Sequence, residues 1–203
     1  MKIGVLALQG AVREHLQQIQ SLGCEAIEVK SLKDLTEING LVLPGGESTT
    51  MKKLLDRYQL LEPIRALAQQ GVPMFGTCAG LILLAKEIVG YDEAHLKLMD
   101  IVIERNSFGR QIHSFEAEIT VNKIGIDIPA VFIRAPHIVS VGPHVEILAE
   151  YDGRIVLARE GQYLGCSFHP ELTDDIRLMQ YFIDMVNDFS KYYTCKNEQH
   201  IVH

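Results

Sequence analysis

The chain has 203 residues, which predicts one domain or at most two small ones and suffices to bury an apolar core without disulfides or a structural metal. Hydrophobic residues make up 47% of the sequence and charged residues 22%, proportions that are typical of a globular protein and exclude a disordered one. The net charge of −7 is not offset by any cluster of lysines or arginines, so nucleic acid and anionic membranes are not expected as partners.

Predicted strands alternate with predicted helices through residue 87. Strands are predicted at residues 2–8, 24–29, 40–46 and 72–77, and helices at 12–22, 49–58, 61–70 and 79–87. The strand segments are short apolar runs, and the helix at 12–22 carries apolar residues along one face. This alternation predicts a parallel sheet that is covered by helices on both faces.

The second half of the chain is dominated by strand-like segments. They lie at residues 98–103, 115–121, 130–135, 137–141, 145–150, 154–160 and 163–168. An amphipathic helix is predicted over 174–193, with Thr173 as its N-cap, and residues 194–203 are expected to form a frayed tail. Residues 1–203 are therefore predicted to form a single α/β domain, with a mainly parallel central sheet, flanking helices and an antiparallel addition.

Cysteine usage predicts a reducing, cytoplasmic location. The four cysteines stand at positions 24, 78, 166 and 195, without a CxxC pair or the dense spacing of a secreted disulfide framework. The N-terminal apolar run covers only residues 3–8, too short for a signal peptide. The uncharged stretch 66–85 is interrupted by glycine, proline and glutamine, so no membrane span is predicted.

The motif GTCAG (76–80) lies at the junction of a predicted strand and a predicted helix. This is the pattern of a nucleophile elbow, in which a tight strand-to-helix turn lifts the central side chain, here Cys78, clear of the sheet. The following helix N-terminus favours a thiolate. A buried cysteine that packs as a small hydrophobe is the alternative, and on this motif alone the two interpretations are evenly balanced.

The tripeptide HPE (169–171) supplies a base for such a nucleophile. Residues two apart on an extended segment project to the same side, so Glu171 is expected to accept a hydrogen bond from His169 and leave the other ring nitrogen for a thiol. Taken alone, this tripeptide is usually a surface turn. Together with Cys78, it favours a catalytic triad of nucleophile, base and orienting carboxylate.

Strand alternation argues against Cys166 as the nucleophile. Along the predicted strand 163–168, Leu164, Cys166 and Phe168 face one side, whereas His169 continues the other side. Cys166 is therefore predicted to lie in the core.

Backbone amides are predicted to form an oxyanion hole near Cys78. The elbow offers the N–H of Ala79, and the turn LPGGES (43–48) offers Gly45 and Gly46, which allow close approach to a ligand. A plain turn between strand and helix is the alternative. The turn also lacks the lysine and the length of a phosphate-binding P-loop. Because ligand sites lie at the carboxyl ends of parallel strands, we expect Gln9, Gly46 and Cys78 to lie together.

These motifs resemble the class I (triad) glutamine amidotransferases. Within that class, five further stretches resemble the glutaminase subunits of the ribose-5-phosphate-dependent pyridoxal 5′-phosphate synthases. They are GVLALQGAVREH (4–15), LPGGEST (43–49), RNSFGRQ (105–111), FIRAP (132–136) and FHPELTDD (168–175). The resemblance runs from residue 1 to about residue 190 and implies a flavodoxin-like, three-layer fold.

The resemblance implies hydrolysis of L-glutamine to L-glutamate and ammonia through a γ-glutamyl thioester. Cys78 would be the nucleophile, His169 the base and Glu171 the residue that holds the imidazole. The resemblance places substrate contacts at Gly46, Glu47, Ser48, Arg105, Ile133 and Arg134. An arginine suits the α-carboxylate and a carboxylate suits the ammonium group, but the sequence does not say which arginine pairs with the carboxylate.

The resemblance further implies a partner, a barrel-shaped synthase subunit that receives the ammonia in a hetero-oligomeric complex. Pyridoxal 5′-phosphate would be the product of that complex, so no cofactor is expected in this chain. The eight histidines show no paired-ligand spacing, and no metal site is predicted.

Three alternatives remain open from the sequence. The chain could serve an amidotransferase of another pathway, such as histidine or purine synthesis. It could be a catalytically silent binding module on the same fold, although no triad residue is missing. It could also be a thiol peptidase or a redox sensor that forms a sulfenate at Cys78.

Overall fold

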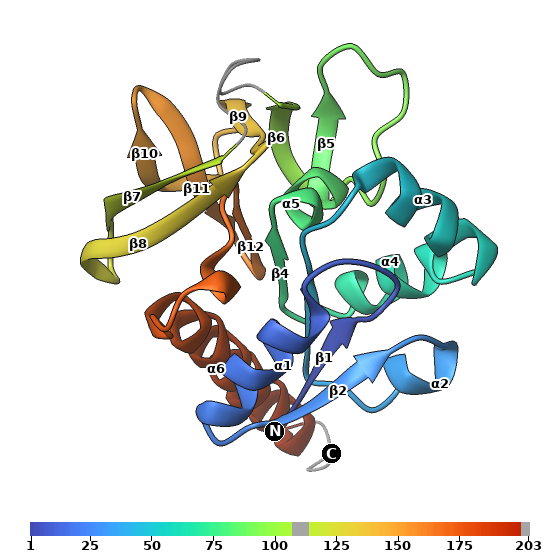
Figure 1. Cartoon of the computed structure of the whole chain (residues 1–203). Helices are drawn as coiled ribbons and strands as arrows, with labels where there is room; N and C mark the ends of the chain where they lie inside the picture. Colours follow the sequence, from blue (N-terminus) through green and yellow to red (C-terminus); the bar gives the residue numbers. More distant parts are fainter. Residues whose placement is uncertain (107–113, 200–203) are drawn as a thin grey trace.

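A computed structural model describes residues 1–106 and 114–199 of the chain (Figure 1). The strands of the large central sheet are β1 (Lys2–Leu6), β2 (Glu25–Val29), β3 (Gly40–Leu43), β4 (Met74–Thr77), β5 (Ala85–Ile88), β6 (Met99–Glu104), β9 (His137–Val141), β10 (Glu146–Tyr151), β11 (Arg154–Glu160) and β12 (Tyr163–Cys166). Their order is β2-β1-β3-β4-β12-β11-β9-β6-β5, with β10 paired to β11. Strands β2, β1, β3, β4 and β12 pair in parallel.

An antiparallel region extends this parallel core. Strand β11 pairs antiparallel with β12, β10 and β9, and β9 pairs antiparallel with β6. A separate antiparallel pair, β7 (Ser114–Val121) and β8 (Gly125–Ile133), lies beside the sheet. The end of β8 delivers two residues to the site described below.

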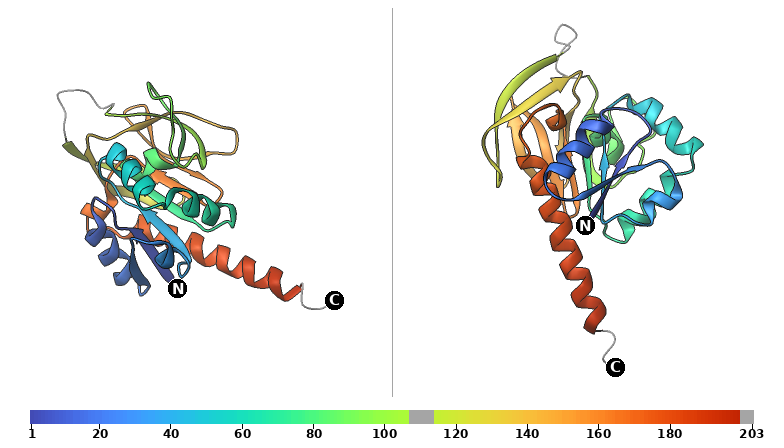
Figure 2. Two further views of the ribbon diagram at one scale, coloured as in Figure 1. Left: turned by 90° about the vertical axis from the view of Figure 1, so that its right-hand side faces the viewer. Right: turned by 60° about the horizontal axis from the view of Figure 1, so that its bottom comes forward.

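Helices cover both faces of the central sheet. They are α1 (Val12–Ser21), α2 (Leu32–Leu35), α3 (Ser48–Arg57), α4 (Leu61–Gln69), α5 (Ala79–Leu84) and α6 (Arg177–Gln199), with a 3-10 turn at Pro170–Leu172. One buried cluster joins the sheet to α2, α3, α4 and α5. The other joins it to α1, α6 and the β7–β8 pair, so Figure 1 shows α1 and α6 away from α3 and α4. The last turns of α6 extend beyond the body of the domain (Figure 2).

The continuous apolar character of the parallel strands follows from this double burial. Val5 and Val42 belong to the cluster beneath α1 and α6, whereas their neighbours Leu6 and Leu43 belong to the cluster beneath α3 and α4. Alternate side chains therefore enter different cores, and neither face of the strand is left for polar residues.

The predicted fold class is confirmed, but several predicted boundaries are wrong. The strand predicted over 130–135 begins earlier, at Gly125, and ends at Ile133, while β1, β3, β4 and β12 are two or three residues shorter than predicted. The helix boundaries also differ. The helix predicted over 79–87 ends at Leu84, because Ala85 turns to an extended conformation and β5 pairs in parallel with β6. The last helix begins at Arg177. The backbone N–H of Arg177 donates a hydrogen bond to the Asp175 carboxylate at 2.9 Å, so Thr173 is not the N-cap. It also continues to Gln199 rather than fraying after residue 193, while residues 200–203 lie outside the described part.

Among the helices of residues 1–106 and 114–199, none combines the length and the apolar character of a membrane-spanning segment.

Candidate active site

The nucleophile elbow has a strained backbone that its two glycines permit. Cys78, between β4 and α5, has φ 49° and ψ −103°, and its N–H donates to the carbonyl of Cys166 at 2.8 Å. A Cβ on Gly76 would lie 2.5 Å from the backbone of Gly80, and one on Gly80 would lie 1.9 Å from the carbonyl oxygen of Leu43. Only glycine fits at either position, so the motif holds Cys78 above the end of the sheet.

His169 and Glu171 are brought together by a turn rather than by an extended strand. Strand β12 ends at Cys166, and Glu171 lies in the 3-10 turn that follows His169. The Nδ1 of His169 nevertheless lies 2.8 Å from Oε1 of Glu171, and both residues are buried. The predicted pairing therefore forms, but the expectation of an extended segment is wrong beyond His169.

The electrostatics of this pair favour a protonated imidazole. Burial by itself would lower the pKa of His169, but its hydrogen bonds to Cys78 and Glu171 outweigh burial and raise the pKa to about 10. Burial raises the pKa of Glu171, and the hydrogen bond from His169 more than offsets this, so the pKa lies below its ordinary value. At neutral pH, His169 therefore holds a proton between a carboxylate and the sulfur of Cys78.

Cys166 lies in the core, as the strand alternation predicts. It is fully buried in the same cluster as Leu164 and Phe168, on the α1–α6 side of the sheet. Burial raises the pKa of its thiol well above the ordinary value, so the thiol stays protonated.

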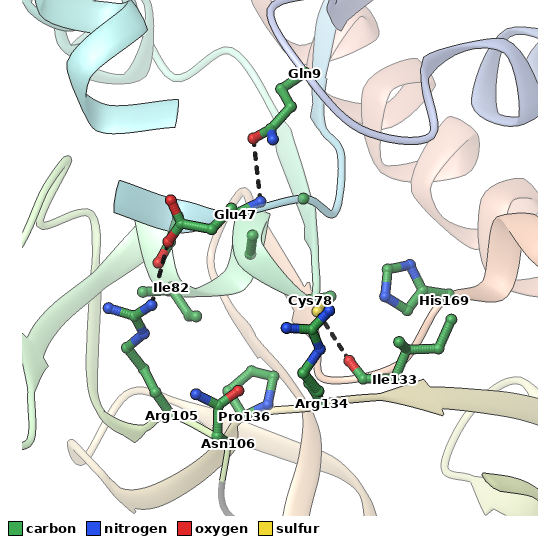
Figure 3. A pocket seen from close by; sticks show the side chains of 13 residues that line it. Gln9, Glu47, Cys78, Ile82, Arg105, Asn106, Ile133, Arg134, Pro136 and His169 are labelled. Atoms are coloured by element: carbon green, nitrogen blue, oxygen red, sulfur yellow. Dashed lines mark hydrogen bonds and ion pairs between the residues drawn. The ribbon is translucent and has the colours of Figure 1, made fainter. Parts of the chain in front are cut away.

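A cavity of about 390 Å³ opens above Cys78 at the carboxyl ends of β1, β3 and β4 (Figure 3). The residues that line it are Gln9, Gly46, Glu47, Ser48, Cys78, Ala79, Ile82, Arg105, Asn106, Ile133, Arg134, Pro136 and His169. Gln9, Gly46 and Cys78 thus lie together, as the topology predicts. Gly45 does not line the cavity, but it packs behind it, where a Cβ would lie 2.4 Å from the His169 ring.

The loop after β3 is held by polar contacts on both sides. The side-chain oxygen of Gln9 accepts a hydrogen bond from the backbone N–H of Glu47 at 3.1 Å. Glu47 caps α3 by accepting from the N–H groups of Thr49 and Thr50. Ser48 is buried, and its hydroxyl has no hydrogen-bond partner among the described residues. Ser48 nevertheless belongs to the lining of the cavity.

The two predicted arginines occupy different environments at the rim. The guanidinium of Arg105 lies 3.4 Å from the Glu47 carboxylate and 4.9 Å from the centre of the Tyr91 ring. Arg134 lies at the end of β8 with φ 42° and is exposed. The neighbouring carbonyl of Ile133 lies 4.0 Å from the Cys78 sulfur (Figure 3). Glu47 offsets part of the charge of Arg105, whereas no ion pair of Arg134 is found within residues 1–106 and 114–199, so among these residues Arg134 carries the less compensated positive charge.

Sequence reasoning missed several residues of this site. Ile82, Asn106 and Pro136 line the cavity, and His15 is buried against Thr77 and Glu171. Asn106 follows Arg105 directly and Pro136 ends the FIRAP motif, so motif neighbourhood was a usable signal. Of the RNSFGRQ motif, residues 107–111 lie outside the described residues. Within the described residues, no group of three or more potential ligands is placed to hold a metal ion.

Comparison with known proteins identifies relatives over nearly the whole chain. The model of the SNO glutamine amidotransferase family matches residues 5–188. The pyridoxal 5′-phosphate synthase subunit PdxT of Geobacillus thermodenitrificans (strain NG80-2) is 66% identical over 188 residues, which cover 93% of this chain and 96% of that protein. PdxT of Geobacillus sp. (strain WCH70) is 65% identical over 188 residues, with coverages of 93% and 98%.

A solved structure agrees with these relatives. A crystal structure of a glutamine amidotransferase matches with a TM-score of 0.87 at 46% identity, and the match covers 91% of this chain and 98% of that chain. The resemblance drawn from GTCAG and HPE is therefore confirmed at the level of the family and the fold. This chain belongs to the SNO glutamine amidotransferase family.

Proposed function

We propose that this chain hydrolyses L-glutamine to L-glutamate and ammonia, and that the ammonia serves a synthase subunit that makes pyridoxal 5′-phosphate in vitamin B6 biosynthesis. The observation that carries the proposal is that Cys78 and His169 line one cavity, with Glu171 2.8 Å from the His169 ring, in a chain of the SNO family. A nucleophile, a base and an orienting carboxylate are the groups that thioester chemistry at an amide requires.

The reaction begins with attack of the Cys78 sulfur on the side-chain carbonyl carbon of glutamine. The proton that the thiol gives up is the one held by His169 in the resting site, where the 2.8 Å contact with Glu171 keeps the imidazole in place. The C–N bond then breaks, His169 gives its proton to the departing nitrogen, and ammonia leaves a γ-glutamyl thioester on Cys78. Water attacks the thioester with His169 as the base, and glutamate departs as the thiol is restored.

The oxyanion of each tetrahedral intermediate faces the backbone of the elbow and of the loop after β3. Ala79 and Gly46 line the cavity beside Cys78, and their N–H groups are the proposed donors together with that of Gly45. Gly45 also has a steric role, because a side chain there would collide with the His169 ring.

The rim of the cavity matches the charges of an amino acid zwitterion. Arg105 and Arg134 supply positive charge for the α-carboxylate, and Glu47 supplies negative charge for the ammonium group. The unpartnered hydroxyl of Ser48 and the backbone at Ile133 complete the proposed substrate contacts. Among the two cations, Arg134 is less compensated and is the stronger partner for the carboxylate.

The acceptor of the ammonia is a second protein, a barrel-shaped synthase subunit in a hetero-oligomeric complex in the cytoplasm. The support is the identity of 65–66% to proteins that are themselves named as subunits of pyridoxal 5′-phosphate synthase. Pyridoxal 5′-phosphate is the product of that complex, and this chain needs no cofactor and no metal for the hydrolysis. An amidotransferase that serves another pathway would carry the same triad but depend on a different partner.

The test is glutamate release from L-glutamine, measured with and without the purified synthase subunit, for the wild-type chain and for Cys78→Ser. We expect hydrolysis that rises when the synthase is added and vanishes in the variant, which should keep its fold. Strong hydrolysis that is indifferent to the synthase would keep the triad and contradict the proposed partner. Retained turnover in Cys78→Ser would contradict the proposed nucleophile, and a folded wild type without any hydrolysis would contradict the enzyme.

A further inference from the structure

A second histidine lies against the carboxylate of the proposed triad, on the side opposite His169. His15, on α1, is fully buried, and its Nε2 lies 3.6 Å from Oε2 of Glu171 and 3.2 Å from the hydroxyl of Thr77. Thr77 directly precedes Cys78. The His15 ring therefore contacts both strands of the site, the one that carries the nucleophile and the one that leads to the carboxylate.

Glu171 needs a donor at this position. Its Oε1 accepts from His169, but Oε2 is buried and has no hydrogen-bond partner among the described residues. A buried carboxylate oxygen without a donor is costly and leaves the carboxylate free to rotate. His15 Nε2 is the nitrogen placed to serve it, at a distance that a small shift of the ring closes, and such contacts commonly tighten when substrate binds.

His15 is suited to donate a hydrogen bond to Glu171 without taking up the proton that His169 holds. Burial lowers the pKa of His15, against the opposing effect of the Glu171 carboxylate, so the ring is neutral. The titratable groups that face it are Glu171 and His169 across the turn and Glu14 beside it on α1. A neutral ring with its proton on Nε2 offers one N–H toward Glu171 and Thr77 and adds no second positive charge beside His169.

The same helix also holds the backbone of the turn that carries Glu171. One turn after His15, the side-chain amide of Gln18 donates to the carbonyl of Pro170 at 3.0 Å and to that of Thr173 at 3.3 Å. Gln18 therefore fixes the 3-10 turn from outside, while His15 addresses the carboxylate itself. Helix α1 supports the turn at both points.

We infer that His15 is a positioning residue for glutamine hydrolysis: it donates from Nε2 to Oε2 of Glu171 and so fixes the carboxylate that orients His169. The inference rests on the proposed function. His15 touches neither the cavity nor the substrate, so it acts on the rate of the chemical steps and not on glutamine binding. Its loss should lower kcat and leave KM unchanged.

The test compares two variants of nearly equal shape, His15→Gln, which keeps an N–H donor, and His15→Met, which has none. Both are assayed for glutamate release in the presence of the synthase subunit, with melting temperatures measured alongside. In metal sites, residues that orient a functional histidine through a carboxylate are typically worth about 10–100-fold in metal affinity or activity, and we take the lower end of that range as the guide for kcat here. We therefore expect His15→Met to lose about tenfold in kcat with an unchanged KM, and His15→Gln to stay within about threefold of wild type.

The matched control is Ile19→Val, which trims a buried side chain of the same helix that belongs to the core cluster. It should lower the melting temperature and leave kcat unchanged. Two results would overturn the inference: a folded His15→Met with wild-type kcat, or a His15→Gln that loses as much kcat as His15→Met. If His15→Met does not fold, His15→Gln decides alone, because a tenfold loss of kcat there is incompatible with rescue by a donor.

Failure of the proposed function would give a different pattern. If the proposed function is wrong, the wild-type chain itself shows no glutamine hydrolysis that depends on Cys78. If only the role of His15 is wrong, the wild-type rate is intact, and His15→Met either matches the wild type or loses as much kcat as His15→Gln.

Discussion

Replacement of Gly80 by alanine tests whether close backbone packing holds the nucleophile in place. Gly80 lies in the first turn of α5, and a Cβ there would lie 1.9 Å from the carbonyl oxygen of Leu43 and 3.1 Å from the Leu43 Cβ. Real Cβ atoms essentially never lie within 3.0 Å of a neighbour, so α5 and β3 must separate by more than about 1 Å. No rotamer change relieves the clash, because the opposing atom belongs to the backbone of a paired strand.

The expected loss in free energy of unfolding follows from the rigidity of the β3 backbone at Leu43. Overpacking a core typically costs about 1–3 kcal/mol, and a clash with sheet backbone belongs at the upper end, at about 3 kcal/mol. For a domain of this size, each kcal/mol lowers the melting temperature by about 2–4 °C, so Gly80→Ala should melt about 6–12 °C below wild type. A displacement of about 1 Å at Cys78 should also lower kcat by about 100-fold.

Thermal unfolding and glutamate release, measured on the same preparations, check both expectations. The matched control is Gly153→Ala, in the turn between β10 and β11, where φ is +69° and nothing lies within 4 Å of the added Cβ. Left-handed strain alone should cost it about 1–2 kcal/mol and leave kcat unchanged. A Gly80→Ala variant that melts and turns over like wild type would refute the argument that the elbow requires glycine at this position.

Two further predictions concern stability. Cys166→Ala should lower the free energy of unfolding by about 1 kcal/mol, the scale of a small core truncation. It should leave the kcat of glutamine hydrolysis unchanged, because the Cys166 thiol lies in the core. A folded variant that loses catalysis would contradict the assignment of Cys166 to the core face of the strand. Burial raises the pKa of Glu47, but its hydrogen bonds to Thr50 and Thr49 outweigh this and lower the pKa to about 2. The contribution of the Glu47 cap to stability is therefore complete above the ordinary pKa of a glutamate and is lost as the pH falls toward 2. The difference in free energy of unfolding between wild type and Glu47→Ala, measured by urea titration, should shrink from about pH 6 to about pH 3. A difference that stays constant over this range would contradict the role of the Glu47 carboxylate as a cap.

Local motifs explain why much of the site could be predicted. The elbow depends on five consecutive residues, and the clashes found for Gly76 and Gly80 are the reason that the pattern GTCAG has small residues where it does. The pairing of His169 with Glu171 is similarly short in range. It survives even though a 3-10 turn follows His169, because the two residues are separated by a single position and the cap conformation of His169 lets its ring reach Glu171.

The wrong boundaries share a different cause. The segment 85–88 continues an apolar helix in sequence, yet it pairs with β6, whose residues lie more than ten positions further along the chain. The start of α6 depends on a side-chain contact of Asp175 rather than on the amphipathic pattern, which begins earlier. In both cases a specific contact overrode the local preference.

By itself, the sequence determined the alternating α/β architecture, the nucleophile elbow and the residues of the proposed triad, because these follow from hydrophobic periodicity and from contacts between near neighbours. Only the tertiary structure decided that Arg105 is paired with Glu47, that Gly45 backs the His169 ring, and that His15 lies against Glu171. His15 and Glu171 are separated by more than 150 positions, and no local pattern marks a helix residue as the neighbour of a distant turn. That contact exists because α1 packs on the same face of the sheet as α6 and brings His15 to the end of β4, and a packing arrangement of this kind depends on the whole fold.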